Sequence, residues 1–164
     1  MVWYLQGCKG RPAYLYIVNS IKNRNIYYAD DDADDRQLFT DVVESMDTPV
    51  DLHLQRDGQE LLERLEDRPP YPTVIFLDIN MPRKNGIEVL RLIRQQEDLK
   101  TVPIVIFSTS DDPDIIKSAR ELGANMFVSK PFSFSKFKKA ITHCLSIDWE
   151  NFRPAREQFL LKFA

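Results

Sequence analysis

Chemically reactive side chains follow four apolar runs that are far apart in this chain of 164 residues. Asp78 ends the run at residues 74–77, and the acidic cluster at residues 30–32 follows a second run. Ser108 ends a third run, and Lys130 follows a fourth. Carboxylates, a hydroxyl group and an ammonium group are together suited to hold Mg²⁺ and to accept a phosphoryl group on a carboxylate.

Each of these groups has a specific part in such chemistry. Mg²⁺ prefers oxygen ligands, and a divalent ion would relieve the mutual repulsion of Asp30, Asp31 and Asp78. The Asp78 oxygen would then attack phosphorus to form an aspartyl phosphate. Lys130 and Ser108 would face the negative charge that spreads over the transferring group. Taken singly, such residues are more often helix caps, turn residues and solvated lysines. Their shared position after strands favours the joint function.

The elements that must position these groups alternate along the chain. Helix-period stretches separate five strand-like runs, and these runs lie at residues 25–29, 50–55, 73–78, 102–107 and 125–129. This alternation predicts βαβ units with right-handed crossovers. We therefore expect a doubly wound α/β domain with a five-stranded parallel sheet surrounded by five helices. The carboxyl ends of its strands share one edge, so the reactive groups should meet there.

Composition and charge exclude several classes of protein. The net charge of −3 argues against a nucleic-acid-binding protein, which would need a basic face. No apolar run reaches the length of a transmembrane helix. Cys8 and Cys144 lack metal-binding or redox spacing, so we expect reduced thiols and a cytoplasmic location.

The two ends of the chain differ from its middle. Residues 24–147 carry the βα pattern. Residues 1–23 contain a strand-like stretch but leave three options open: a disordered extension, an added edge strand, or sequence upstream of the natural start. Residues 148–164 are rich in aromatic residues and are expected to form a tail, with a short amphipathic helix as one option. Because the tail is too short for an effector domain, we expect a single-domain protein.

Over residues 25–147 the chain resembles the receiver domain of response regulators, the phosphoacceptor module of two-component signalling. This resemblance implies a flavodoxin-like sheet with the strand order 2-1-3-4-5. The resemblance rests on five motifs, which are Ala29-Asp30-Asp31-Asp32, Leu77-Asp78-Ile79-Asn80-Met81-Pro82, Asn85-Gly86, Phe107-Ser108-Thr109 and Lys130-Pro131-Phe132. Weaker features are similar to small stand-alone regulators of the phytochrome-associated type, among them Arg56-Asp57-Gly58 and Trp149.

The resemblance implies a role for each matching residue. Asp78 would be phosphorylated by a sensor histidine kinase, of phytochrome-like or other type, or by a phosphotransfer protein. Mg²⁺ would be held by Asp31, by Asp30 mainly through water, and by the Asn80 carbonyl. Lys130 would pair with the phosphoryl oxygens.

Further residues are implied in switching. Ser108 and Phe127 would respond to phosphorylation, while Asn80 and Ser110 would tune hydrolysis. The signal would leave through a protein–protein surface made by the fourth helix, fifth strand and fifth helix, with a homodimer as one possible outcome. The Lys130-Pro131 bond is expected to be cis.

Two other functions were considered. A phosphatase of the haloacid-dehalogenase type also forms an aspartyl phosphate, but it needs an acid two residues after the nucleophile, where this chain has Asn80. A phosphorylation-independent module of the same fold would be expected to have lost some of the reactive residues. We therefore expect a signalling phosphoacceptor rather than an enzyme. In the aromatic stretch at residues 132–137, Phe134 and Phe137 are expected to lie in the core.

Overall fold

The computed structural model of the chain describes residues 24–46, 49–66, 73–149, 152 and 158–163. Its strands are β1 (Arg24–Ala29), β2 (Val50–Gln55), β3 (Val74–Leu77), β4 (Ile104–Ser108), β5 (Met126–Ser129) and β6 (Leu160–Leu161). Its helices are α2 (Ala33–Glu44), α3 (Gly58–Glu66), α4 (Gly86–Gln95), α5 (Pro113–Glu121) and α6 (Phe134–Ser146). The predicted extension at residues 1–23 lies outside the described residues.

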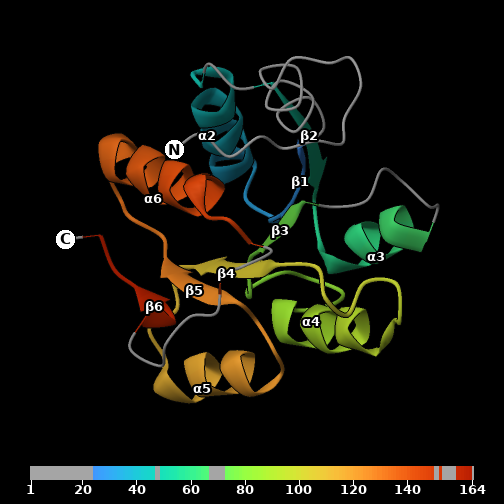
Figure 1. Cartoon of the computed structure of the whole chain (residues 1–164). Coiled ribbons are helices and arrows are strands. Elements are labelled where there is room, and N and C mark those ends of the chain that lie inside the picture. The colour runs from blue at the N-terminus through green and yellow to red at the C-terminus, as the bar shows by residue number, and fades with distance from the viewer. Residues whose placement is uncertain (1–23, 47–48, 67–72, 150–151, 153–157, 164) are drawn as a thin grey trace, which may run out of the picture.

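One parallel sheet forms the centre of the molecule, with the strand order β2-β1-β3-β4-β5-β6. Helices α2 and α6 lie on one side of the sheet, and α3, α4 and α5 lie on the other (Figure 1). The predicted five-stranded order 2-1-3-4-5 and the doubly wound topology are thus confirmed, and the sheet is extended by β6.

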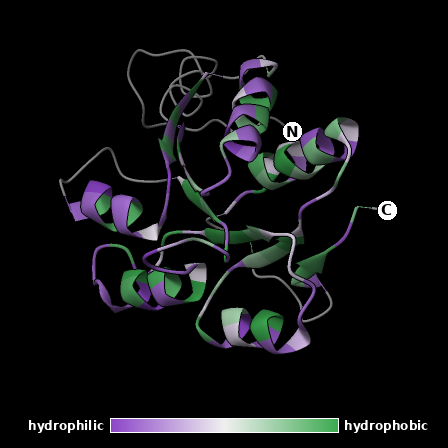
Figure 2. Ribbon diagram, turned by 180° about the vertical axis from the view of Figure 1, so that it is seen from behind, coloured by the Kyte–Doolittle hydropathy of each residue, from purple (hydrophilic) through white to green (hydrophobic). Residues whose placement is uncertain are grey.

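Burial on both faces explains why the central strands are almost wholly apolar. All residues of β3 and β4 are buried, as is usual for parallel strands covered on both sides. The helices, in contrast, are amphipathic: Figure 2 shows hydrophobic and hydrophilic residues alternating along them at helical spacing. One cluster of buried side chains lies on each side of the sheet, with Leu90 central to one and Phe39 to the other.

Three helices begin at residues that favour a helix start. Asn85 forms a capping box with Glu88 at the start of α4, and Asp112 caps α5 just before Pro113. Helix α3 begins at Gly58, as expected from Asp57-Gly58. The left-handed residue expected after α5 is Gly123, with φ 92°.

The described end of the tail forms a strand, whereas a short amphipathic helix was one option for residues 148–164. Leu160 and Leu161 form β6, which pairs in parallel with Phe127 and Val128 of β5. Phe159 is 4% exposed and packs in the cluster on the α3–α5 side of the sheet. Because β5 would otherwise leave its backbone groups unpaired at an edge, the apolar tail is better satisfied by adding a strand than by forming a helix there.

Two further expectations are wrong. The structure has no cis peptide bond among the described residues, so Lys130–Pro131 is trans, the form that X–Pro bonds adopt more often. Phe137 is buried as expected, but Phe134, at the first position of α6, is 50% exposed, and Phe132 is fully exposed.

Cys144 is a free, buried thiol, and burial raises its pKa to about 12. It is therefore protonated and unreactive at neutral pH. Cys8 lies outside the described residues. No helix in the described part of the chain combines the length and the apolar character needed to cross a bilayer.

Candidate functional site

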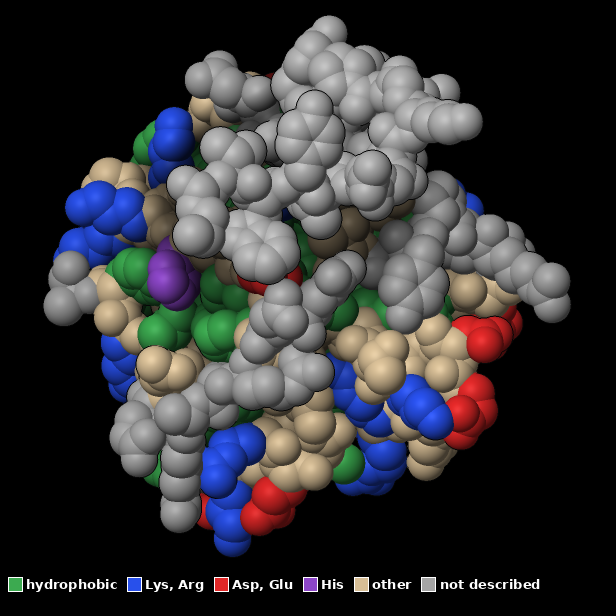
Figure 3. All heavy atoms as spheres, viewed as in Figure 1, with side chains coloured by type: hydrophobic (Ala, Val, Ile, Leu, Met, Phe, Trp, Pro, Cys, Tyr) green, Lys and Arg blue, Asp and Glu red, His purple; other side chains and the backbone are tan. Residues whose placement is uncertain are grey.

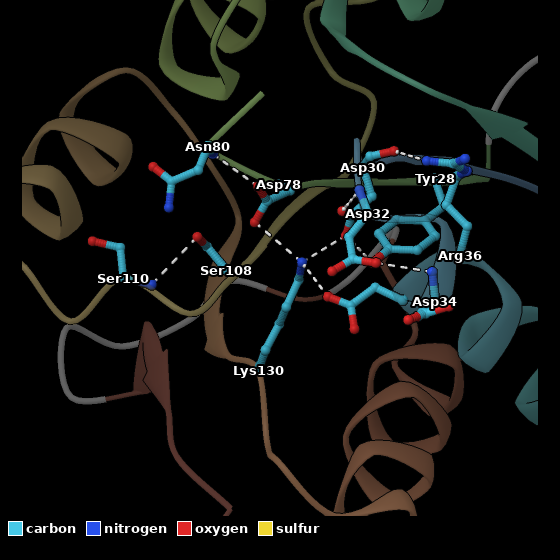
Figure 4. A network of polar contacts seen from close by, with 11 residues as sticks. Tyr28, Asp30, Asp32, Asp34, Arg36, Asp78, Asn80, Ser108, Ser110 and Lys130 are labelled. Atoms are coloured by element: carbon cyan, nitrogen blue, oxygen red, sulfur yellow. Dashed lines mark hydrogen bonds and ion pairs between the residues drawn. The ribbon is translucent and has the colours of Figure 1, made fainter. Parts of the chain in front are cut away.

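The carboxyl ends of β1, β3 and β5 bring three carboxylates and one ammonium group together. Asp30 follows β1, Asp78 follows β3, and Lys130 follows β5. Nζ of Lys130 lies 2.6 Å from Oδ2 of Asp30 and 3.3 Å from Oδ1 of Asp78 (Figure 4). Residues 100 positions apart in the sequence therefore share one ion-pair network at this edge of the sheet.

The acidic residues are arranged to hold a cation. Asp30 and Asp78 are buried, whereas Asp31 is exposed, and one carboxylate oxygen from each lies within 4.8 Å of the others. Oxygen ligands on opposite sides of an octahedral Mg²⁺ ion are about 4.2 Å apart, because each lies about 2.1 Å from the metal. The three carboxylates thus need only a small adjustment to fit Mg²⁺, and their chemistry is that of a hard-cation site.

Burial and charge shift the protonation of Asp30 and Lys130. Burial raises the pKa of Asp30, and the attraction of Lys130 only partly offsets this effect. For Lys130, burial lowers the pKa, but the carboxylates of Asp78 and Asp30 outweigh it and hold the pKa above its usual value. Lys130 is therefore charged throughout the physiological range, and the buried acids depend on that charge.

Hydrogen bonds fix Asp30 and Asp78 in place. The hydroxyl of Tyr28 donates to Oδ2 of Asp30, and the backbone N–H of Asp32 donates to Oδ1 at 3.0 Å. The backbone N–H of Asn80 donates to Oδ2 of Asp78 at 2.8 Å. With one Asp78 oxygen held by Asn80 and the other facing Lys130, the carboxylate has a defined orientation at the opening of the site.

The hydroxyl groups predicted for the site lie at the carboxyl end of β4, whose last residue is Ser108. Ser108 is fully buried, and its Oγ accepts the backbone N–H of Ser110 at 3.4 Å. Figure 4 shows Ser108 and Asn80 on the side of Asp78 that faces away from Asp30. The backbone N–H of Lys130 donates to the Ser108 carbonyl at 2.9 Å, so β4 and β5 hold these two residues in register.

Phe127 is placed away from the opening of the site. It lies inside β5, three residues before Lys130, and its side chain is fully buried. Its backbone N–H donates to the carbonyl of Phe159 at 2.7 Å. Asp32, the third acid of the cluster, caps α2 by accepting the N–H of Asp34 at 2.8 Å and does not belong to the cation-binding group.

One residue of the site was not predicted from the sequence. Oδ2 of Asp35 lies 2.9 Å from Nζ of Lys130, and its side chain is 29% exposed. An acid in the first turn of a helix such as α2 is explained by the helix macrodipole alone. The available signal was its position in the first turn of α2, because a helix that begins at the sheet edge keeps that turn beside the strand ends.

The surface over α5 and α6 carries charged side chains. On the face shown in Figure 3, basic side chains lie over α6, and basic and acidic side chains are intermixed over α5. Lys136 and Lys139 on α6 are exposed, as expected for a solvated helix face.

Comparisons with known proteins agree with this geometry. The family model described as the response regulator receiver domain matches residues 26–142. The chain is 33% identical over 110 residues to response regulator Rcp1 of Synechocystis sp., which covers 64% of this chain and 75% of that protein. The Mn²⁺-bound structure of Rcp1 has a TM-score of 0.71 at 30% identity, covering 80% of this chain and 99% of that one.

A second solved structure is similar to the same extent. It is the phosphorylated cyanobacterial phytochrome response regulator RcpA, with a TM-score of 0.72 at 27% identity, covering 80% of this chain and 97% of that one.

Proposed function

Because the chain belongs to the response regulator receiver domain family, a signalling family phosphorylated on aspartate, we propose that Asp78 is the residue that accepts the phosphoryl group. The observation that carries this proposal is the convergence of Asp30, Asp78 and Lys130 at one edge of the sheet, with Nζ of Lys130 3.3 Å from Asp78. Only Asp78 in this group has a carboxylate oriented by the backbone N–H of Asn80.

In the proposed reaction, an Asp78 oxygen attacks the phosphorus of a phosphohistidine on the donor protein. A new P–O bond forms as the P–N bond breaks, and the electron pair of that bond leaves with the imidazole nitrogen. Lys130 donates to the phosphoryl oxygens, and Ser108 donates its hydroxyl hydrogen to another of them. The protein acts on no separate substrate and catalyses only its own phosphorylation and dephosphorylation.

Asp30, Asp31, Asp78 and the carbonyl of Asn80 would hold Mg²⁺, which would neutralise charge on the phosphoryl group when bound. The oxygen donors and their separation support this assignment. So does the similarity to Rcp1, whose solved structure is a Mn²⁺-bound form.

The proposed donor is a sensor histidine kinase or a phosphotransfer protein in the cytoplasm. Phe132 is fully exposed and Phe134 half exposed, both just after Lys130. Exposed aromatic side chains beside a reactive centre suit a protein partner rather than a small molecule. The similarity to RcpA, a phytochrome response regulator, supports a phytochrome-like kinase.

We place the output at α5, β5 and α6, where Ser108 and Phe127 connect the site to the rest of the fold. Phosphorylation adds charge and acceptor oxygens at the sheet edge, and movement of Ser108 and Phe127 would shift a pre-existing equilibrium of this surface. Its target is another protein or a second copy of this chain.

The test is to incubate the protein with Mg²⁺ and acetyl phosphate. The mass of the polypeptide is followed by mass spectrometry, and its oligomeric state is followed by light scattering. We expect the mass of one phosphoryl group to be gained, and the gain to require Mg²⁺. The control variant Asp78→Asn should gain none. Uptake of phosphate by that variant would refute the assignment of Asp78.

Asp35 provides a second prediction. Replacing Asp35 with asparagine removes a carboxylate that competes for Lys130 and repels an anionic donor. Phosphorylation by acetyl phosphate should become about fivefold faster, since one unit charge at such distances is worth about 1 kcal/mol in water. Stability should change by less than about 1 kcal/mol, because the Asp35 side chain is partly exposed.

The matched control for this prediction is Asp34→Asn, which removes the same charge from an exposed neighbouring position. Its phosphorylation rate should stay near that of the native protein. A slower reaction in Asp35→Asn would mean instead that Asp35 assists catalysis by positioning Lys130.

A further inference from the structure

An ion pair outside the reactive centre joins the loop after Asp78 to the start of α3. Nη2 of Arg83 donates to Oδ2 of Asp57, whose side chain is only 7% exposed. The other Asp57 oxygen, Oδ1, accepts the backbone N–H groups of Gln59 at 2.9 Å and Glu60 at 3.0 Å. Asp57 therefore uses one oxygen to cap α3 and the other to hold the loop between β3 and α4.

The charge of Asp57 is maintained by these contacts. Burial alone would raise its pKa, but the hydrogen bond from Arg83 and those from the backbone of α3 outweigh burial and hold the pKa below its usual value. The pair is therefore ionised at neutral pH, and it is lost only when the pH falls below the usual carboxyl range and through the lowered pKa of Asp57.

The backbone of Arg83 is in an uncommon conformation. Its φ of 63° is the sole positive value at a non-glycine position in the described part of the chain. Side chains other than those of glycine, asparagine and aspartate adopt this region reluctantly. The surrounding contacts must therefore hold Arg83 in place, and strained residues of this kind gather at functional sites.

Close backbone contacts hold the same loop at both ends. A Cβ atom on Gly58, the first residue of α3, would lie 2.6 Å from the carbonyl oxygen of Lys84. A Cβ atom on Gly86 would lie 2.2 Å from the carbonyl oxygen of Asp78. Residues 79–85 are thus packed against α3 on one side and against the acceptor strand on the other.

This loop contains Asn80, whose backbone N–H orients Asp78 and whose carbonyl is a proposed metal ligand. We propose that the Arg83–Asp57 pair is a positioning element that sets the place of the Asn80 backbone, and through it the affinity of the acidic site for Mg²⁺. Neither side chain belongs to the cation-binding group itself. The inference rests on the function proposed above.

The test measures Mg²⁺ binding by isothermal titration calorimetry, without any phosphoryl donor. The variants are Arg83→Met, Asp57→Asn and the double variant, because asparagine keeps the capping ability of Asp57. We expect each single variant to bind Mg²⁺ roughly tenfold more weakly, as is common when a residue supporting a metal ligand is removed. The double variant should be no weaker than the weaker single variant, because the two residues act as a unit.

Simple electrostatics predicts the opposite sign for Arg83→Met. Removing a positive charge from the neighbourhood of a cation site should leave Mg²⁺ binding unchanged or strengthen it. Lys100→Met is the matched control, since Lys100 forms an exposed ion pair with Glu97 elsewhere in the chain. Arg83→Lys keeps the charge and should retain most of the native affinity.

Two further readings separate the possible failures. Amide hydrogen exchange over residues 79–85 should be faster in both single variants, while urea unfolding should show that they remain folded. Native-like Mg²⁺ affinity in folded Arg83→Met and Asp57→Asn would overturn the positioning role alone. Absence of Mg²⁺ binding in the native protein would overturn the proposed metal site, and this inference with it.

Discussion

Replacing Lys130 with methionine is expected to lower the free energy of unfolding by about 3–5 kcal/mol, because it leaves the buried carboxylates of Asp30 and Asp78 without their shared cation. Methionine keeps much of the volume of the side chain, so the loss reports charge rather than packing. The same change should slow phosphorylation by roughly 10²–10³-fold, the usual cost of removing one group that stabilises a developing anion. Urea unfolding and acetyl phosphate kinetics measure the two effects.

The loss of stability should depend on pH in a defined direction. Burial already raises the pKa of Asp30 in the native protein, and loss of the ammonium raises it further. A carboxyl group whose folded-state pKa lies above its unfolded-state value binds protons more readily when folded, so stability falls as the pH rises through that range. The variant should therefore be closest to the native protein in acid and furthest from it at neutral pH.

Mg²⁺ should restore part of the stability of Lys130→Met, because the ion replaces the missing positive charge among the three acids. Lys117→Met is the control, since Lys117 lies 3.9 Å from Glu121 in an exposed pair that contributes little. If Lys130→Met proved as stable as the native protein at neutral pH, the buried acids would have to be neutral, and the proposed site would lose its electrostatic basis.

The reactive edge of the sheet was predictable because it depends on topology. Once five alternating strands are recognised, the positions of Asp30, Asp78, Ser108 and Lys130 at strand ends follow from the parallel arrangement alone. These residues are also polar or charged side chains at the ends of apolar strands, so they can be recognised in a single sequence.

Other contacts of the site were not predictable in the same way. Asp35 and Asp57 are ordinary residues for the start of a helix, and capping explains them fully at the level of sequence. Their contacts with Lys130 and Arg83 depend on which way each helix faces, and that orientation is set by packing rather than by local pattern. The positive φ of Arg83 likewise has no signal in its residue type.

The structure of the tail stays open at the level of sequence, because its aromatic residues fit a helix and a strand equally well. A two-residue strand is too short to show alternation. What decides the outcome is the free edge of β5, which becomes known only when the strand order is known. Because β6 lies at the edge of the sheet, its contribution to stability can be tested separately from that of the other strands.

Phe159 is 4% exposed and packs among core residues. If β6 unfolds together with the rest of the domain, replacing Phe159 with alanine should therefore lower the free energy of unfolding by about 3–5 kcal/mol. A two-residue edge strand can also detach by itself, in which case the global loss would be smaller. The backbone N–H of Phe127 separates these outcomes, because it donates to the carbonyl of Phe159. Its hydrogen exchange should accelerate in either case.

Lys162→Gln is the matched change just after β6. Lys162 lies 3.2 Å from Asp111, and its side chain is 54% exposed, so its loss should cost less than about 1 kcal/mol and leave exchange at Phe127 nearly unchanged. Equal exchange at Phe127 in Phe159→Ala and the native protein would mean that β6 does not protect β5. Faster exchange at Phe127 with a small loss of global stability would instead show that β6 detaches from β5 without unfolding of the domain. Because β5 carries Phe127 and leads to Lys130, pairing of the tail would then be linked to the acidic site through this one strand.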